Sequence, residues 1–201
     1  IASMARSGTA FIINTLAEAL DRPFISIFSS TYPLQQYVSM DLAEALSERR
    51  VICADHFFPS EEVLLDLKLA GFNQVYVHIR DPRQATLSWF YHMEKRFDSN
   101  ILEWPRYRGL IGLPDSYPDW EKVKKLSWLA ENYYPRCVKW IEDWLNAEKS
   151  NHGLFIRVGD YAEFHVDPLS YLNNLANFFD HADKVTVDSL PDISDPILHY
   201  R

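Results

Sequence analysis

The sequence is poor in cysteine and has no long hydrophobic run. Its 201 residues include only two cysteines, Cys53 and Cys137, which are too few for a disulfide framework or a zinc site. One lies in a strand-like run and the other in a helical one, so both are expected to be free, buried thiols. No apolar stretch approaches the roughly 20 residues that span a bilayer, and no signal peptide opens the sequence. These absences favour a cytoplasmic protein without a membrane partner.

Positive charge is also scarce. The formal net charge is −8 and the sequence pI is about 5.3. Broad binding to nucleic acid or to an anionic membrane needs a basic surface, so neither partner is expected. A small anionic ligand is compatible with this charge, because a few cations in one pocket override a diffuse negative surface. The sequence is 47% hydrophobic and 24% charged, which predicts one ordinary soluble globular domain over residues 1–201. It leaves open what precedes Ile1 and the oligomeric state.

Strand-like and helix-like segments alternate along the chain. This alternation predicts a three-layer α/β fold with a mostly parallel sheet flanked by helices. Residues 98–119 are rich in proline, tyrosine and glycine, and we expect them to form an irregular lid that helps to bind an acceptor. The expected strands are the opening residues, 23–30, 50–55, 74–80 and 153–158, and the expected helices are 9–20, 38–49, 60–69, 82–97, 120–144 with a kink at Pro135, and 168–179.

Three polar segments directly follow predicted strands. They are the loop Arg6-Ser7-Gly8-Thr9, the pair Asp55-His56, and Arg80. Because ligands bind at the carboxyl ends of parallel strands, we expect these segments to meet at one sheet edge. In the loop, glycine permits a tight turn, backbone N–H groups at a helix start favour an anion, and the arginine adds charge.

The loop alone does not identify its ligand. It is not a Walker A loop, because the GxxxxGK[ST] pattern, with its lysine and its magnesium-binding hydroxyl, is missing. An ordinary turn between a strand and a helix explains the loop about as well as an anion cradle does. Arg80 and Ser88 lie eight positions apart. By themselves they are explained by an exposed arginine and a solvent-facing helical serine, which is the commonest situation of such residues.

Four segments together resemble the sulfotransferases that use 3′-phosphoadenosine 5′-phosphosulfate (PAPS). ASMARSGTAF (2–11) resembles the family's phosphate loop ASYPKSGTTW, and VICADHFFP (51–59) occupies the place of its KTHLP segment. VYVHIRDPRQATLSWFYH (75–92) resembles its 3′-phosphate-binding segment, with the same arginine-to-serine spacing. Residues 153–179 follow its later pattern of a strand, a YEDL-like turn, "DP" and a helix that ends in phenylalanines. The resemblance covers most of the chain and implies a P-loop-like sulfotransferase fold.

For the loop, the resemblance implies a role for each residue. Arg6 takes the place of the lysine that contacts the bridging oxygen and the leaving 5′-phosphate. Phe11 matches the tryptophan that stacks near the adenine. The residues that would wrap the phosphate, mainly through backbone amides, are Ser7, Gly8, Thr9 and Ala10.

The resemblance also implies a 3′-phosphate site and a catalytic base. Arg80 and Ser88 would grip the 3′-phosphate, and His56 would be the general base for an acceptor hydroxyl, a role that suits an imidazole at neutral pH. The family's C-terminal Arg-Lys-Gly motif is not recognisable, and Arg201 or a missing tail would have to replace it. PAPS would be the co-substrate and 3′,5′-adenosine bisphosphate (PAP) the product, with no metal. The acceptor would be a small molecule or carbohydrate, of a class that the sequence leaves open.

Several positions depart from the family pattern. Ala5 and Arg6 stand where the loop has proline and lysine, and Ala10 removes one hydroxyl ligand. Ala54 replaces the lysine that assists the sulfuryl group, and Asp55 replaces the neighbouring threonine. These departures keep two alternatives open. One is a P-loop-type kinase of small metabolites, disfavoured by the missing Walker lysine, and the other is a catalytically weak protein that retains the nucleotide site.

The other histidines and the tryptophans receive mostly structural interpretations. His78 lies inside the apolar strand 74–80 and is expected to be a core histidine with satisfied hydrogen bonds. His92 is a candidate for lining the acceptor pocket. Four tryptophans are expected to pack in the core and not to bind a cofactor; they are Trp120, Trp128, Trp140 and Trp144.

Overall fold

A parallel sheet lies at the centre of the molecule. The computed structural model describes residues 1–28, 37–46, 51–99, 104–150, 153–181 and 185–190. Strands β1 (Ala2–Ser3), β4 (Gln74–Ile79) and β5 (Phe155–Asp160) are parallel and lie in the order β1-β4-β5. Strands β2 (Phe24–Ile25) and β3 (Ile52–Cys53) form a second parallel pair.

The two groups of strands are joined through the first residues of the chain. A parallel bridge pairs Ala2 with Asp55, the Ser3 amide donates to the Asp55 carbonyl at 3.0 Å, and the Asp55 amide donates to the Ile1 carbonyl at 3.1 Å. The strand order across the joined layer is therefore β2-β3-β1-β4-β5. All five strands point the same way, so their carboxyl ends share one edge.

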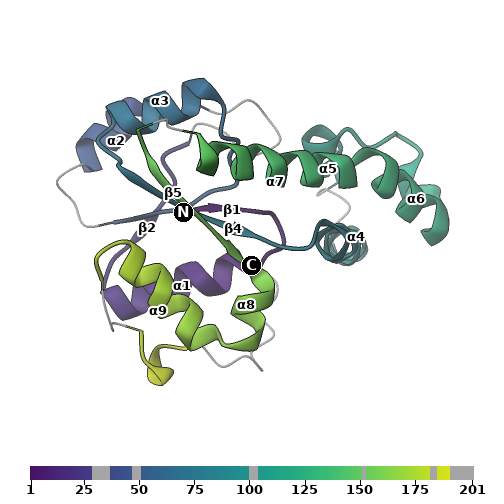
Figure 1. Ribbon diagram of the computed structural model, residues 1–201. Coiled ribbons are helices and arrows are strands. Elements are labelled where there is room, and N and C mark those ends of the chain that lie inside the picture. Colours follow the sequence, from purple (N-terminus) through teal and green to yellow (C-terminus); the bar gives the residue numbers. More distant parts are fainter. Residues whose placement is uncertain (29–36, 47–50, 100–103, 151–152, 182–184, 191–201) are drawn as a thin grey trace.

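Helices cover both faces of this sheet (Figure 1). On one face lie α1 (Thr9–Leu20), α8 (Tyr161–Val166) and α9 (Pro168–Phe178), and on the other lie α2 (Met40–Leu46), α3 (Glu61–Leu69) and α7 (Tyr134–Lys149). Beyond the strand ends lie α4 (Pro82–Ser99), α5 (Trp104–Ile111) and α6 (Lys122–Asn132), and the short 3₁₀ turns are η2 (Tyr117–Asp119) and η3 (Val187–Ser189). The predicted three-layer α/β architecture is confirmed.

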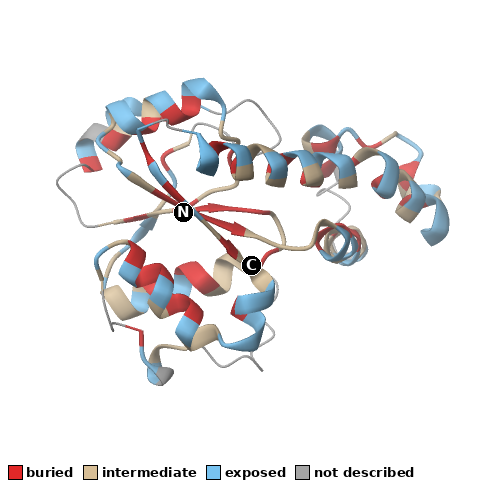
Figure 2. Cartoon of the chain, viewed as in Figure 1, coloured by how far each residue is buried: buried red, intermediate tan, exposed pale blue. Residues whose placement is uncertain are grey.

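Each face of the sheet has its own buried cluster, and the strands between them are buried from both sides (Figure 2). Val77 and Trp144 belong to one cluster, and Ile12 and Leu172 to the other. This double burial explains why β4 is an almost unbroken apolar run. The polar residues of that run are Gln74 at its start and His78, which is fully buried.

Predicted helix starts are confirmed where a side chain caps the helix. The Ser60 hydroxyl accepts from the Val63 amide at 3.3 Å, and the Asp167 carboxylate accepts from the Ser170 amide at 3.0 Å. Asp81, just before α4, accepts from the Arg83 amide at 2.8 Å. Each cap satisfies an N–H group that has no partner inside its own helix.

Two predictions about the middle of the chain are wrong. Residues 98–119 are not irregular throughout: α4 continues to Ser99, and α5 forms because Tyr107 and Ile111, four positions apart, both bury their side chains against the core. The helix expected over 120–144 is broken at Tyr133 into α6 and α7 instead of being kinked at Pro135. The proline stands in the first turn of α7, where its missing N–H costs nothing.

Other predictions vary in outcome. Strand β2 is shorter than expected, and residues 29–30 of the predicted strand and most of the tail 181–201 lie outside the described residues. The thiols of Cys53 and Cys137 are both free, the first half-buried and the second buried. Trp140 and Trp144 are core residues whose indole N–H groups donate to the Phe57 carbonyl. Within the described ranges, no helix is long and apolar enough to cross a membrane.

Candidate functional site

The loop between β1 and α1 is a tight turn with strained backbone. Arg6 and Gly8 both have left-handed conformations, with φ of 67° and 84°. Ser7 is buried between them, and its hydroxyl donates to the Met4 carbonyl at 2.6 Å. A Cβ at Gly8 would lie 3.4 Å from the rings of both Tyr161 and Phe164. A left-handed arginine costs free energy, and such strain tends to concentrate at functional sites.

A row of backbone N–H groups follows this turn. The first hydrogen bond of α1 runs from the Ile12 amide to the Gly8 carbonyl, at 3.2 Å. The amides of Gly8, Thr9, Ala10 and Phe11 donate to no group among the residues that the structure describes. Consecutive N–H groups at the start of a helix carry partial positive charge, and together they form an anion-binding cradle.

Arg80 and Ser88 meet the loop from β4 and α4. An Arg80 Nη donates to the Arg6 carbonyl at 2.6 Å, and the Arg80 guanidinium lies 4.3 Å from the centre of the Tyr161 ring. Arg6 Nε donates to Ser88 Oγ at 3.4 Å. The Arg80 Nε atom is buried and has no hydrogen-bond partner among the described residues. A buried donor without an acceptor is costly, and an anion bound at this point would satisfy it.

His56 lies on the other side of the loop, after β3. Its Nδ1 atom is 2.7 Å from the Ser3 carbonyl oxygen and 3.2 Å from Ser3 Oγ. A carbonyl only accepts, so Nδ1 carries the proton and Nε2 keeps a lone pair. Burial lowers the pKa of His56 below its usual 6.5, and the nearby Arg6 charge acts in the same direction, against the opposing effects of the Ser3 carbonyl and Asp55. The imidazole is therefore a neutral base at pH 7.

Asp55 holds the chain at His56. Its carboxylate accepts from the backbone amide of His56 at 2.7 Å and from the hydroxyl of Ser26. The sequence did not predict that Asp55 orients the imidazole of His56, because side chains of neighbouring residues in a strand point to opposite faces. Asp55 hydrogen-bonds to the backbone of His56, and its charge opposes the lowering of the imidazole pKa.

Aromatic residues line the space next to His56. A void of about 10 Å³ separates His56 from Tyr133, Cys137 and Trp140. Trp89 of α4 stacks on Tyr133 with ring centres 5.6 Å apart. His92, predicted as a possible pocket residue, has its Nε2 atom 2.9 Å from the hydroxyl of Tyr107, which α5 supplies.

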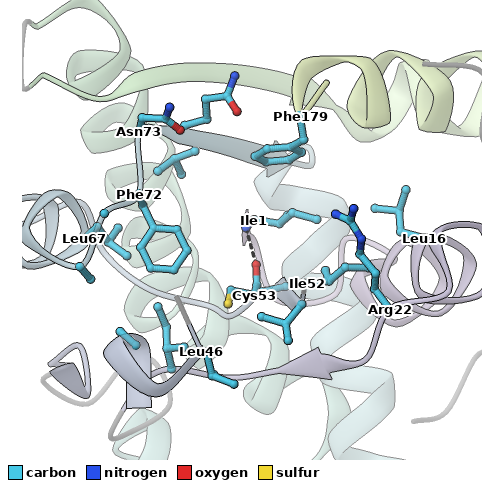
Figure 3. A pocket seen from close by; sticks show the side chains of 18 of the residues that line it. Ile1, Leu16, Arg22, Leu46, Ile52, Cys53, Leu67, Phe72, Asn73 and Phe179 are labelled. Carbon is cyan, nitrogen blue, oxygen red and sulfur yellow. Dashed lines mark hydrogen bonds between the residues drawn. The ribbon is translucent and has the colours of Figure 1, made fainter. Parts of the chain in front are cut away.

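A larger cavity lies elsewhere, at the amino ends of the strands (Figure 3). It has a volume of about 540 Å³ and is lined by residues that include Leu46, Phe72 and Phe179. The Ile1 amine enters it and donates to the Cys53 carbonyl at 2.6 Å. None of the predicted site residues lines this cavity. The carboxyl edge, where charged groups and free amides converge, is the better candidate site.

The predicted site residues are largely brought together. Arg6 is hydrogen-bonded to Ser88 through its side chain and to Arg80 through its carbonyl, and His56 lies beside the same loop. Phe11 is half-buried and packs edge-on against Phe164, with ring centres 5.4 Å apart. Arg201 lies outside the described residues. Over the described ranges, no three His, Cys, Asp or Glu side chains gather closely enough to hold a metal ion.

Two residues contact the loop in a way that the sequence did not predict. Tyr161 supports Arg80 and packs against Gly8, and the only hint of it was the YEDL-like turn. His78 is the core histidine that was predicted, with no exposed surface and both ring nitrogens hydrogen-bonded. Its partner Ser7 is 71 residues away, and periodicity carries no information about such a contact.

One of three comparisons with known proteins finds a similar structure. No protein-family model matches the chain, and a search of curated proteins found no match. Among solved structures, the chain is similar to mouse sulfotransferase SULT7A1 complexed with PAP, with a TM-score of 0.58 and 16% sequence identity. The match covers 94% of this chain and 59% of that one, so this chain spans about three fifths of its length. The likeness confirms the predicted sulfotransferase fold.

Proposed function

We propose that this chain binds PAPS and transfers its sulfuryl group to the hydroxyl or amine of an acceptor. The observation that carries the proposal is the anion cradle at the carboxyl edge of the sheet. There, the amides of residues 8–11 and the Nε atom of Arg80 have no partner among the described residues, and Arg80 bonds to the Arg6 carbonyl. Two cationic groups, Arg6 in the loop and Arg80 after β4, suit a nucleotide with phosphates at two positions.

Each part of the cradle has a counterpart on PAPS. The amides and Arg6 would hold the 5′-phosphate, to which the sulfuryl group is attached. Arg80 and Ser88 would hold the 3′-phosphate, the group that distinguishes this nucleotide from ADP. The buried Arg80 Nε needs an acceptor, and a phosphate oxygen supplies one. Ala10 contributes its backbone amide but no hydroxyl.

His56 would act as the general base. Its Nε2 lone pair accepts the proton of the acceptor group as the acceptor oxygen or nitrogen bonds to sulfur. The bond between sulfur and the bridging oxygen breaks, and PAP leaves with the electron pair. Arg6 and the loop amides stabilise the charge that builds on the leaving phosphate. PAPS supplies the activated sulfuryl group, and the chain supplies binding, alignment and proton removal.

The acceptor would approach from the side of α4, α5 and α7. His56 faces Tyr133 there, and Tyr107 brings α5 into the same region. We therefore propose that part of residues 98–119 contributes to acceptor binding as a packed helix, where an irregular lid was predicted. A small molecule or a carbohydrate with a free hydroxyl fits this proposal.

Transfer of labelled sulfate from PAPS to a panel of alcohols, phenols, carbohydrates and amines tests the proposal. We expect turnover by the wild type and at least a hundredfold loss in His56→Ala, with PAP affinity preserved. His181→Ala is the matched control, because His181 bonds Arg22 next to the distant cavity. Full activity in His56→Ala would assign the base to another residue. PAP binding without transfer to any acceptor would favour a catalytically weak nucleotide-binding protein.

A further inference from the structure

A buried histidine lies directly beneath the anion cradle. His78, in β4, has no exposed surface. Its Nε2 atom is 2.6 Å from the backbone carbonyl oxygen of Ser7, and its Nδ1 atom is 2.6 Å from the hydroxyl of Tyr171 in α9. Both nitrogens are therefore used, one by the loop and one by a helix on the sheet's face.

The partners of His78 determine which nitrogen carries the proton. The Ser7 carbonyl only accepts, so Nε2 carries the hydrogen and donates it. Burial lowers the pKa of His78 to about 4, so the ring is neutral at pH 7 and Nδ1 is an acceptor. Tyr171 must then donate to Nδ1. The result is a directional chain of two hydrogen bonds, from the Tyr171 hydroxyl through His78 to the Ser7 carbonyl.

This chain of hydrogen bonds fixes one peptide plane of the loop. In a trans peptide, the C=O and N–H groups point in opposite directions. The Ser7 carbonyl points into the core towards His78, so the Gly8 N–H points away from the core. Gly8 is also the first residue in the row of free amides. Rotation of this peptide would turn that N–H inward and bring a carbonyl oxygen, which repels anions, into the cradle.

We propose that His78 is a positioning residue: its hydrogen bond to the Ser7 carbonyl holds the Gly8 N–H in the orientation that binds the 5′-phosphate. That the bound anion is the 5′-phosphate of PAPS rests on the proposed function. His78 touches neither nucleotide nor acceptor in this arrangement. It acts through the backbone of the loop.

The surroundings of His78 leave the ring little freedom. Its ring meets those of Phe164 and Tyr171 edge-on, with centres 5.9 and 5.4 Å apart. At Gly159 in β5, a Cβ would lie 2.7 Å from the Tyr171 hydroxyl and closer still to that of Tyr76. The glycine therefore makes room for both hydroxyls, and that of Tyr171 completes the chain of hydrogen bonds. Such a locked, fully satisfied group is suited to holding a strained loop in one state.

Two substitutions at the same position separate positioning from packing. His78→Gln can place an amide N–H near the position of Nε2 and still donate to Ser7, whereas His78→Leu cannot. We expect His78→Leu to weaken PAP binding by about tenfold or more, since one positioning hydrogen bond is lost. We expect His78→Gln to stay within about threefold of wild type. Leu64→Ala, a buried position in α3, is the control for general destabilisation and should leave PAP affinity unchanged.

A kinetic comparison and one replacement variant complete the design. His78→Leu should raise KM for PAPS and leave KM for the acceptor unchanged, a split that loss of stability alone does not produce. If His78→Leu fails to fold, His78→Phe replaces it, because its ring is closer in shape to imidazole and likewise cannot donate to the Ser7 carbonyl. PAP affinity equal to wild type in the folded variant would overturn the proposal.

The state of the ring can be tested without any ligand. Nitrogen NMR of wild-type protein labelled at histidine should show His78 neutral and protonated at Nε2, and a proton on Nδ1 instead would overturn the proposal. Failure of the wild type to bind PAP would count against the proposed function. The His78 proposal would then be decided by this tautomer and by whether the Gly8 amide resonance shifts in His78→Leu more than in His78→Gln.

Discussion

Lowering the pH should reduce the free energy of unfolding because His78 is buried, and the substitution His78→Gln should remove this part of the pH dependence. The pKa of this histidine is about 4 in the folded protein, because the ring is buried, against 6.5 as its ordinary value. The unfolded chain therefore takes up a proton between pH 6.5 and 4 that the folded protein refuses. The contribution is fully favourable above pH 6.5 and is lost as the pH falls towards 4. At about 1.4 kcal/mol for each pH unit, the loss amounts to about 3 kcal/mol.

Urea unfolding of wild type and His78→Gln at several pH values between 7 and 4 measures this loss. Glutamine does not titrate, so the free energy of unfolding of the variant should fall by about 3 kcal/mol less over the same range. Other titrating groups are present in both proteins and cancel in the difference. Parallel curves for the two proteins would refute a buried, neutral His78.

Two further predictions concern packing and catalysis. Gly159→Ala should lower the free energy of unfolding by about 1–3 kcal/mol, because the new methyl group would overlap the Tyr171 hydroxyl. The control is Gly109→Ala in α5, where a Cβ meets nothing within 4 Å. It should leave the free energy of unfolding unchanged or raise it by up to about 1 kcal/mol. Equal changes for the two variants in urea titrations would contradict this account. The plot of kcat/KM against pH should fall on the acidic side below pH 6.5, because burial lowers the pKa of His56 and protonation removes the base. A midpoint above 6.5 would argue against His56.

The elements predicted well are those whose local pattern and packing agree. Helix α1 has the predicted bounds, Thr9–Leu20, because its apolar face follows the helical period directly after the loop. Strand β4 was predicted within one residue, because a strand buried on both faces is an apolar, β-branched run. Arg6, His56 and Arg80 could be placed at one edge, because parallel strands align their carboxyl ends.

The elements predicted poorly depend on contacts between distant parts of the chain. Pro105 and Gly109 argued locally against a helix, yet α5 forms because Tyr107 and Ile111 are buried against the core. Tertiary packing outweighed local propensity there. The role of His78 depends on Ser7, far away in the sequence, and no periodicity marks such a pair. The strained backbone of the loop is likewise set by its surroundings.

The most direct measurement of the central claim is a calorimetric titration of the wild type with PAP and with ADP. The account predicts tighter binding of PAP by at least tenfold, because Arg80 and Ser88 are the residues proposed to hold the 3′-phosphate. Arg80→Met should abolish this preference. The control is Arg83→Met, which should retain the preference. Arg83 lies three positions after Arg80, is exposed, and forms an ion pair with Asp81. A preference for ADP, or equal affinity for the two nucleotides, would contradict the account.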